Sequence, residues 1–140
     1  MIADIARAWI GTPYVHQASV KGAGTDCLGL LRGIWRDIRG VEPVEIPPYS
    51  RDWSEATGRE DLMEAADRWL IRKDLADVAA GDVLLFRMRT GSVAKHLGIQ
   101  GDVSPPTFIH AYSGHAVLES ALTDAWLRKI VARYRFATGE

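Results

Sequence analysis

Residues 24–35 read GTDCLGLLRGIW, and this stretch decides which fold the sequence predicts. Apolar residues at helical spacing begin near Cys27, directly after a glycine-rich loop, and Gly40 is placed to end the helix that they predict. Thr25 or Asp26 is a suitable N-cap. The expected apolar stripe of this helix recurs at i, i+3, i+7 and i+10 and consists of Leu28, Leu31, Trp35 and Ile38.

Helical patterns lie on both sides of this stretch. Before it, apolar residues recur at helical spacing over residues 2–9 and predict a short amphipathic helix. After it, residues 41–53 are rich in proline and are expected to form an extended surface loop. Thr57 and Glu60 then make a capping-box pattern, which predicts a helix that ends near Leu70. The expected buried stripe of that helix is Leu62, Ala66 and Trp69.

After residue 80 the period of the apolar residues changes from that of a helix to that of a strand. Strands are expected at 83–86, 95–100, 108–112, 116–119 and 130–136, with a short helix at 123–128. Turns are expected at Gly81-Asp82, at Gly91-Ser92, at a third place marked by Gly101-Asp102 and Pro105-Pro106 together, and at Ser113-Gly114. Arg133 and Arg135 are two positions apart and are expected to lie on one solvated face of the last strand. Helices first and strands last predict one α+β domain over residues 1–140, with N-terminal helices packed on a C-terminal antiparallel sheet.

The composition is that of an ordinary globular domain without an excess of charge. Of the 140 residues, 47% are hydrophobic and 25% are charged, and the formal net charge is −1. This balance argues against a general affinity for nucleic acid or for an anionic membrane surface. No apolar run approaches the ~18 residues of a membrane-spanning helix, and the first nine residues lack the pattern of a signal peptide. We therefore expect a protein made in the cytoplasm without an export signal and without membrane insertion.

The single cysteine, Cys27, is the strongest candidate for chemistry. One cysteine excludes an intrachain disulfide and a cysteine-pair metal site. A free cysteine is commonly a small buried core residue, but this one begins a helix, where the helix end and its free N–H groups lower the pKa of a thiol. The same N–H groups are suited to hold a developing oxyanion. We therefore expect Cys27 to be a nucleophile with a lowered pKa.

A cysteine nucleophile needs a base, and histidine is the usual one. His96 lies near the start of one expected strand and His110 lies inside the next, so antiparallel pairing brings the two imidazoles side by side on one face. One then serves as the base while the other fixes its tautomer. His115 follows a turn and is expected to be solvated. A metal site is the competing use of histidines, but no His-x-x-x-His motif is present, and we expect no metal and no cofactor.

Three further residues are candidates for binding a substrate. Tyr14 lies in the loop before Cys27, where its hydroxyl supports either an oxyanion hole or local packing. Asp26 is either only a helix N-cap or a carboxylate that binds a substrate amine. His16 lies in the same loop and is placed to line a cleft.

Taken in order, five segments resemble the NlpC family of bacterial cell-wall cysteine peptidases. They are WIGTPY at 9–14, TDCLGL at 25–30, AGDVLLF at 80–86, HLGI at 96–99 and FIHA at 108–111. The sequence is most similar to the phage-tail and gene-transfer-agent branch, because it shares YVHQAS at 14–19 and a long proline-rich insert.

The resemblance implies a papain-like (NlpC-type) fold in which Cys27 attacks a peptide bond of the peptidoglycan stem. In this family the bond typically joins D-γ-glutamate to a diamino acid. The resemblance implies His96 as the base, His110 as the orienting third residue, Tyr14 near the oxyanion or the substrate, and Asp26 at the free amine of the stem. It further implies other tail or baseplate proteins as partners, and assembly into a virion-like tail that acts at the cell wall.

Leu28 departs from the family pattern, since many members have serine after the nucleophile. This departure concerns the substrate subsite and leaves the nucleophile in place. Two alternatives remain open: a structural tail-assembly module that keeps the fold without turnover, and an amidase or acyltransferase that uses the same cysteine. Thiol reactivity near pH 6 would separate an enzyme from a scaffold, and product masses would separate the reactions.

Overall fold

Helices dominate the first half of the chain and strands the second, so the predicted α+β class is confirmed. The computed structural model describes residues 1–42, 60–112 and 114–137. Its helices are α1 (Ile2–Arg7), α2 (Cys27–Arg39), α3 (Asp61–Trp69) and α4 (Asp124–Leu127). Its strands are β1 (Ser19–Val20), β2 (Gly24–Thr25), β3 (Ile71–Lys73), β4 (Val83–Phe86), β5 (His96–Val103), β6 (Pro106–Ala111), β7 (Val117–Ala121) and β8 (Ile130–Arg135).

Six of the strands form one antiparallel sheet in the order β3-β8-β4-β5-β6-β7. Strands β4 to β7 are a meander, as the regular turn signals predict. Strand β8 returns from the end of the chain to lie between β3 and β4, which no local signal indicates. A separate ribbon of β1 and β2 precedes α2, and neither of these strands nor β3 is expected from the sequence.

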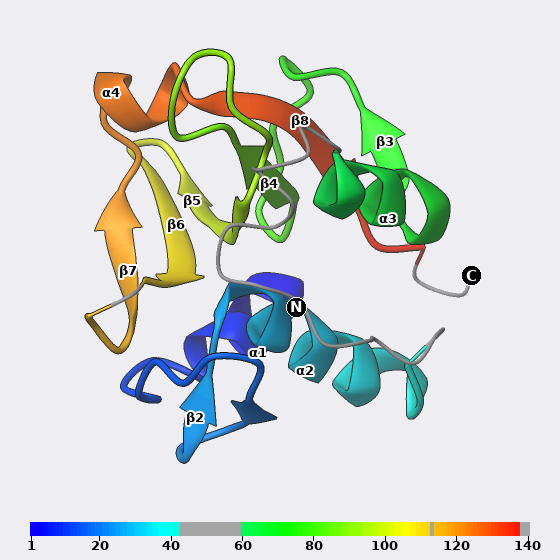
Figure 1. Ribbon diagram of the computed structural model, residues 1–140, viewed down its shortest axis with the longest axis vertical. Helices are drawn as coiled ribbons and strands as arrows, with labels where there is room; N and C mark the ends of the chain where they lie inside the picture. Colours follow the sequence, from blue (N-terminus) through cyan, green and yellow to red (C-terminus); the bar gives the residue numbers. More distant parts are fainter. Residues whose placement is uncertain (43–59, 113, 138–140) are drawn as a thin grey trace.

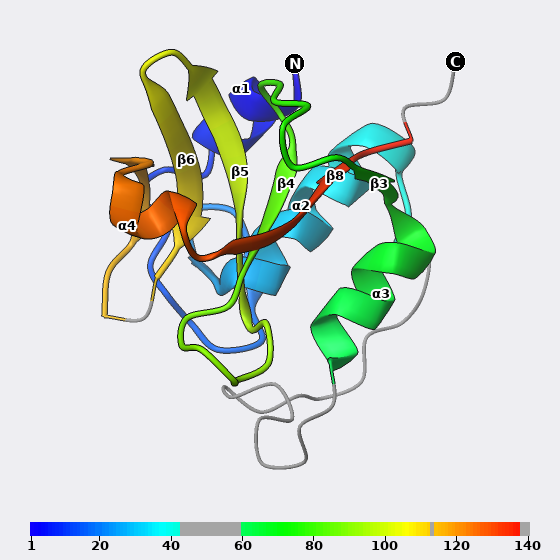
Figure 2. The same cartoon turned by 90° about the horizontal axis from the view of Figure 1, so that it is seen from above.

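Helices cover both faces of the sheet. Figures 1 and 2 show α1 and α2 on one face and α4 on the other. The first face carries the larger core cluster, in which Leu30 and Ile34 of α2 pack against Leu97 and Ile109. The second face carries a smaller cluster built on Leu84, Phe86, Phe108 and Leu122. The strands that carry the site are therefore buried on both faces.

Helix α2 begins and ends as the sequence predicts, but its buried face is rotated. Asp26 is the N-cap and accepts a hydrogen bond from Gly29 N at 2.7 Å, and Gly40 ends the helix with φ 84°. The residues that contribute no exposed surface are Leu30 and Ile34. The predicted stripe is thus only partly right: Leu28 is buried, whereas Leu31, Trp35 and Ile38 are half-buried at the edge of the core.

Gly33 of α2 is required by a close approach to the indole of Trp9. A Cβ at this position would overlap the Trp9 ring, and the ring itself is only 3% exposed. Helix propensity alone would make Gly33→Ala more stable by about 1 kcal/mol. The steric overlap with Trp9 costs more than the gain in helix propensity. We therefore expect Gly33→Ala to lose about 1–3 kcal/mol of unfolding free energy in urea titrations. Asp37→Ala, exposed in the same helix, is the control, and a Gly33→Ala protein more stable than wild type would contradict the packing.

Several predicted boundaries differ in the structure. The third predicted turn is present but shorter than its marks: Gly101 and Asp102 belong to β5, and the chain turns at Ser104-Pro105. In α3, Leu62 and Ala66 are buried as expected, but Trp69 is 38% exposed. Leu70 is buried instead of Trp69, because the helix has ended and the backbone at Leu70 is extended. Thr57, Ser113 and residues 43–53 of the proline-rich segment lie outside the described residues.

The prediction that Arg133 lies on a solvated face is wrong. This residue is 3% exposed, and its guanidinium donates to Asp82 Oδ2 at 2.8 Å and to Gln100 Oε1 at 3.0 Å. Lys73 Nζ lies 2.8 Å from Asp82 Oδ1, so two cations share one buried carboxylate. Arg135, the other arginine of the pattern, is exposed as expected. The network ties β3, β4, β5 and β8 together.

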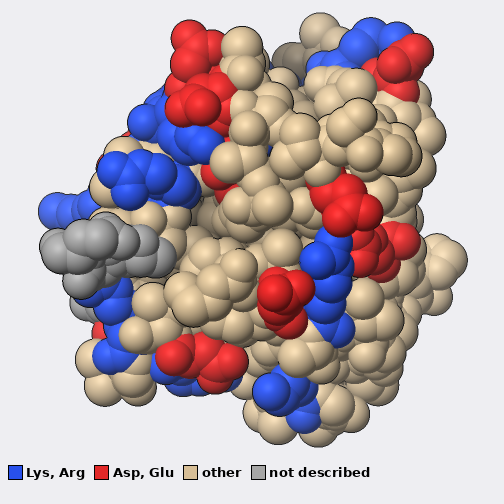
Figure 3. All heavy atoms as spheres, turned by 180° about the vertical axis from the view of Figure 1, so that it is seen from behind, with Lys and Arg blue, Asp and Glu red and all other residues tan. Residues whose placement is uncertain are grey.

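Charge on the surface is mixed, in keeping with the net charge of −1. On the face opposite that of Figure 1, acidic and basic side chains are interspersed and separated by uncharged surface (Figure 3). This face therefore presents no field of a single sign to a polyanion.

Candidate active site

The N-terminus of α2 meets the sheet at the end where β5 begins and β6 ends (Figure 1). Cys27 is the first residue of α2 and is 8% exposed. Its Sγ lies 4.0 Å from the carbonyl oxygen of Lys95, and the backbone of Leu97 also hydrogen-bonds the sulfur. The sulfur therefore contacts the residues on both sides of His96.

His96 and His110 are in direct contact, as the strand pattern predicts. His96 Nε2 lies 2.9 Å from His110 Nδ1, and both rings are buried. Ile99 pairs with Ile109 in the β5–β6 ladder, so the two histidines stand on the same face of neighbouring strands. Gly98 makes room for this contact, since a Cβ there would press on Phe108 and on His110 Cβ.

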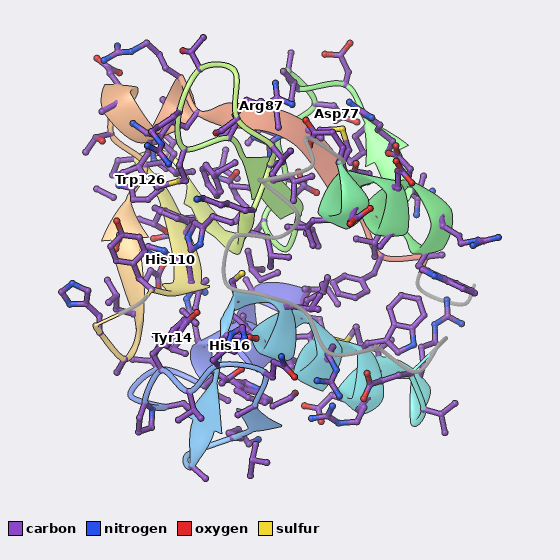
Figure 4. All side chains as sticks on the ribbon, viewed as in Figure 1. Tyr14, His16, Asp77, Arg87, His110 and Trp126 are labelled. Atoms are coloured by element: carbon purple, nitrogen blue, oxygen red, sulfur yellow. The ribbon has the colours of Figure 1, made fainter. Side chains whose placement is uncertain are left out.

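The sequence does not indicate two residues that complete the surroundings of this pair. Ser120 of β7 places its Oγ 3.1 Å from His110 Nε2. Trp126 of α4 packs its ring 5.5 Å from that of His110 and 5.9 Å from that of His96, centroid to centroid (Figure 4). A serine in a strand and a tryptophan in a four-residue helix carry no motif, and only the tertiary fold brings them here.

Both members of the Cys27–His96 set are neutral at pH 7 in this structure, so the expected lowering of the thiol pKa is wrong. Burial, followed by the charge of Asp26, raises the pKa of Cys27 to about 12. Backbone hydrogen bonds from Leu97 and Leu28 act in the expected direction but are outweighed. Burial, followed by repulsion from His110, lowers the pKa of His96 to about 3. A neutral thiol and a neutral imidazole are the pair from which general-base catalysis starts.

The buried neutral histidines predict a loss of stability in acid. Below pH 6.5 the unfolded chain protonates at His96, whereas the folded chain does so only near pH 3. The unfolded state then binds more protons, so stability falls as the pH falls through this window. Burial also lowers the pKa of His110, to about 4, which adds to the effect. In urea titrations at pH 7 to 4 we expect His96→Gln to lose less stability than wild type over this range.

His115→Gln is the control for this prediction, because His115 is exposed and stacks on Tyr112 at the surface. Its charge adds to the lowering of the His110 pKa, so the control should change the pH profile only slightly. The difference between His96→Gln and wild type should be on the order of a few kcal/mol at pH 4. Parallel pH profiles for wild type and His96→Gln would contradict the buried neutral state.

The three candidate substrate-binding residues all lie on the helix side of the site. Tyr14 forms an isolated bridge with Thr25, two residues before the nucleophile. Asp26 is 2% exposed, and its two oxygens accept from Gly29 N and Gln17 N, each at 2.7 Å. His16 Nδ1 lies 3.8 Å from Asp26 Oδ2, and Figure 4 shows Tyr14 and His16 beside the end of the sheet that carries His110. The contacts of Asp26 are those of a loop anchor, and an amine contact for it stays a prediction.

Within the described ranges 1–42, 60–112 and 114–137, no group of three or more His, Cys, Asp or Glu side chains is placed to hold a metal ion. In the same part of the chain, no helix has the length and apolar character needed to cross a bilayer.

Comparison with known proteins identifies the fold through structure and not through sequence. No protein-family model and no curated protein matches the sequence. Solved structures do match, among them an NLP/P60 family lipoprotein-like protein from Staphylococcus aureus, the NlpC/p60 domain of the peptidoglycan hydrolase SagA, and an NlpC/P60 family protein from Bacillus cereus. Their TM-scores are 0.60, 0.62 and 0.64, at 20%, 21% and 19% identity.

The matches cover 96–97% of this chain but different shares of the other proteins. The chain spans 39% of the Staphylococcus aureus protein and 40% of the Bacillus cereus protein, whereas it spans 96% of the SagA domain. The chain therefore aligns with nearly all of the SagA domain and with less than half of the other two proteins. The chain has the papain-like α+β fold of the NlpC/P60 structures.

Proposed function

We propose that this chain is a cysteine peptidase that hydrolyses the stem peptides of peptidoglycan. One observation carries the proposal: the helix N-terminus bearing Cys27 abuts the start of the strand bearing His96, which is hydrogen-bonded to His110. The fold is that of NlpC/P60 structures, one of which is the domain of a peptidoglycan hydrolase. A buried thiol that contacts the backbone on both sides of His96, with His96 itself in a buried imidazole pair, suits acyl transfer better than it suits a purely structural core.

The proposed reaction begins from the neutral pair. His96 Nε2 is occupied by His110, so Nδ1 is the nitrogen available to take the proton. As Sγ attacks the carbonyl carbon of the scissile bond, the S–H proton moves to His96, and the oxyanion forms near the N–H groups at the start of α2. The imidazolium then protonates the leaving amine, and water hydrolyses the thioester with His96 as base.

The bond proposed is the one between D-γ-glutamate and the diamino acid, cleaved as an endopeptidase would cleave it. Tyr14, His16 and Asp26 line the helix side of the site and are proposed to contact the stem. Leu28 is 7% exposed and packs into the core, so a subsite serine is replaced here by a buried apolar side chain. A peptide that needs a hydroxyl at this place would bind poorly.

Mass spectrometry of defined muropeptides tests this proposal. Purified chain should convert a disaccharide tetrapeptide into a disaccharide bearing L-Ala-D-Glu and a free dipeptide that begins with the diamino acid. Release of the whole peptide from the sugar would instead identify an amidase. Products joined to an added amine would identify a transferase.

A particle-borne role is the finer part of the proposal. The YVHQAS stretch at 14–19 and the long proline-rich insert support assembly with tail or baseplate proteins of a phage-like particle or gene transfer agent. The chain would then be made in the cytoplasm and act at the cell wall as part of the tail. Co-purification of the chain with isolated particles, and its loss from tail-less particles, would test this.

A silent structural module is the second candidate, and one observation favours it. Burial raises the pKa of Cys27 to about 12, which keeps the thiol unreactive at rest. Slow alkylation near pH 6 therefore fits both a scaffold and a general-base enzyme. Turnover of muropeptides is the measurement that separates them.

A further inference from the structure

A chain of hydrogen bonds crosses three neighbouring strands and ends at a serine. His96 on β5 contacts His110 on β6 at 2.9 Å, and His110 Nε2 contacts Ser120 Oγ on β7 at 3.1 Å. In the β6–β7 ladder Phe108 pairs with Ser120 and His110 pairs with Leu118. Ser120 therefore lies diagonally across from His110 on the same face of the sheet.

Two directions of hydrogen bonding fit these distances, and they have opposite consequences. In the first, His96 Nε2–H donates to His110 Nδ1, and His110 Nε2–H donates to Ser120 Oγ. In the second, the serine hydroxyl donates to His110 Nε2, and His110 Nδ1–H donates to His96 Nε2. Neutral imidazole has one N–H, so only the first direction leaves His96 Nδ1 unprotonated.

We infer that Ser120 is a positioning residue that accepts the Nε2–H of His110 and thereby holds His96 in the tautomer of a base. The inference rests on the proposed function, in which His96 takes the proton of Cys27. After that transfer His96 carries both protons and must still donate from Nε2. His110 must then keep Nδ1 as an acceptor, which requires that its own proton stay on Nε2.

The other neighbours of His110 fix the plane of its ring but not its tautomer. Phe108 stacks on the ring with centroids 4.0 Å apart and planes at 23°, Trp126 meets it edge-on at 5.5 Å, and Tyr112 lies tilted against it at 5.7 Å. None of these three aromatic rings accepts a conventional hydrogen bond in the plane of the imidazole. Ser120 is half-buried, so its own hydroxyl proton has access to water while the oxygen accepts from His110.

The matched pair Ser120→Thr and Ser120→Val tests the inference, because the two side chains share a shape and differ in the hydroxyl. Long-range ¹H–¹⁵N NMR of the histidine rings reads the tautomers directly. We expect Nε2–H on both His96 and His110 in wild type and in Ser120→Thr. In Ser120→Val we expect His110 to populate the Nδ1–H form.

The kinetic expectation is a selective loss in kcat. Ser120→Val should lower kcat for a stem peptide by about 10- to 100-fold with KM changed less than about twofold, and Ser120→Thr should restore it. Ser92→Ala is the control, because Ser92 Oγ donates to the loop carbonyl of Arg89 at 2.8 Å, away from the histidine pair. A wild-type His110 protonated at Nδ1, or identical tautomers in the Thr and Val variants, would overturn the inference.

The NMR arm keeps this inference separate from the proposed function. If wild type fails to cleave muropeptides yet shows the Ser120-dependent tautomers, the peptidase proposal fails and the positioning role of Ser120 stands. If wild type cleaves muropeptides and the tautomers are the same in Ser120→Thr and Ser120→Val, the peptidase proposal stands and the positioning role of Ser120 fails. Thermal melting of both variants confirms that the compared proteins are folded.

Discussion

Cys27→Ala is expected to abolish hydrolysis of stem peptides, lowering kcat by about 10⁵-fold or more. The alanine removes the only atom that can form the acyl intermediate, and the chain has no second cysteine to replace it. What remains is binding and polarisation by backbone N–H groups, which gives little rate enhancement without a nucleophile. The loss is measured as free diamino-acid peptide released per minute, by liquid chromatography.

The variant should stay folded, which makes the result interpretable. Cys27 packs at the edge of the larger core cluster, and alanine differs from it by a single sulfur atom. Cys27→Ser provides the matched control, because it keeps the shape and a weaker nucleophile, and we expect it to be nearly as inactive. Undiminished turnover in Cys27→Ala would contradict the assignment of the nucleophile.

Asp82→Ala is expected to lose about 3–5 kcal/mol of unfolding free energy. This carboxylate is 2% exposed and accepts from Lys73, Arg133 and the Ala79 backbone N–H. Without it, Arg133 remains buried with a charge that its other contacts, to Gln100 Oε1 and the Leu75 carbonyl, do not neutralise. Urea titration at pH 7 measures the loss.

Asp77→Ala is the matched control for this prediction. Asp77 also pairs with Lys73, at 3.9 Å, but its side chain is 70% exposed, and Figure 4 shows it at the rim of the molecule. An exposed ion pair contributes about 1 kcal/mol or less. Equal losses in Asp82→Ala and Asp77→Ala would contradict the buried network. The double variant Asp82→Leu/Arg133→Met should recover part of the stability, because it removes two of the three charges of the network and leaves Lys73 with its ion pair to Asp77.

The sequence predicted the parts of this fold that depend on neighbours along the chain. Cys27 at a helix start, Asp26 as the N-cap and Gly40 as the end all follow from local rules. So does the meander that brings His96 to His110, because adjacent antiparallel strands leave few alternatives for the pairing. The fold class follows from the order of the elements.

What the sequence missed depends on residues that are distant along the chain. Arg133 was predicted to be solvated because its partner Asp82 lies 51 residues away in the sequence, just before β4. The place of β8 between β3 and β4, and the contacts of Ser120 and Trp126, are likewise set by tertiary packing. The pKa of Cys27 was predicted in the wrong direction because burial depends on the whole fold, whereas helix-end effects are local.

The single thiol allows the central claim to be tested by one titration. Samples alkylated with iodoacetamide at pH 9 to increasing extents carry their thiol label only at Cys27, since no other cysteine is present. Peptide mapping by mass spectrometry gives the fraction labelled at Cys27, apart from any label on amines or imidazoles, and muropeptide hydrolysis by the same samples, returned to pH 7, gives the remaining activity. We predict that activity falls in direct proportion to the label and reaches zero at one label per chain. Full activity in a completely labelled sample would contradict the claim that Cys27 is the nucleophile.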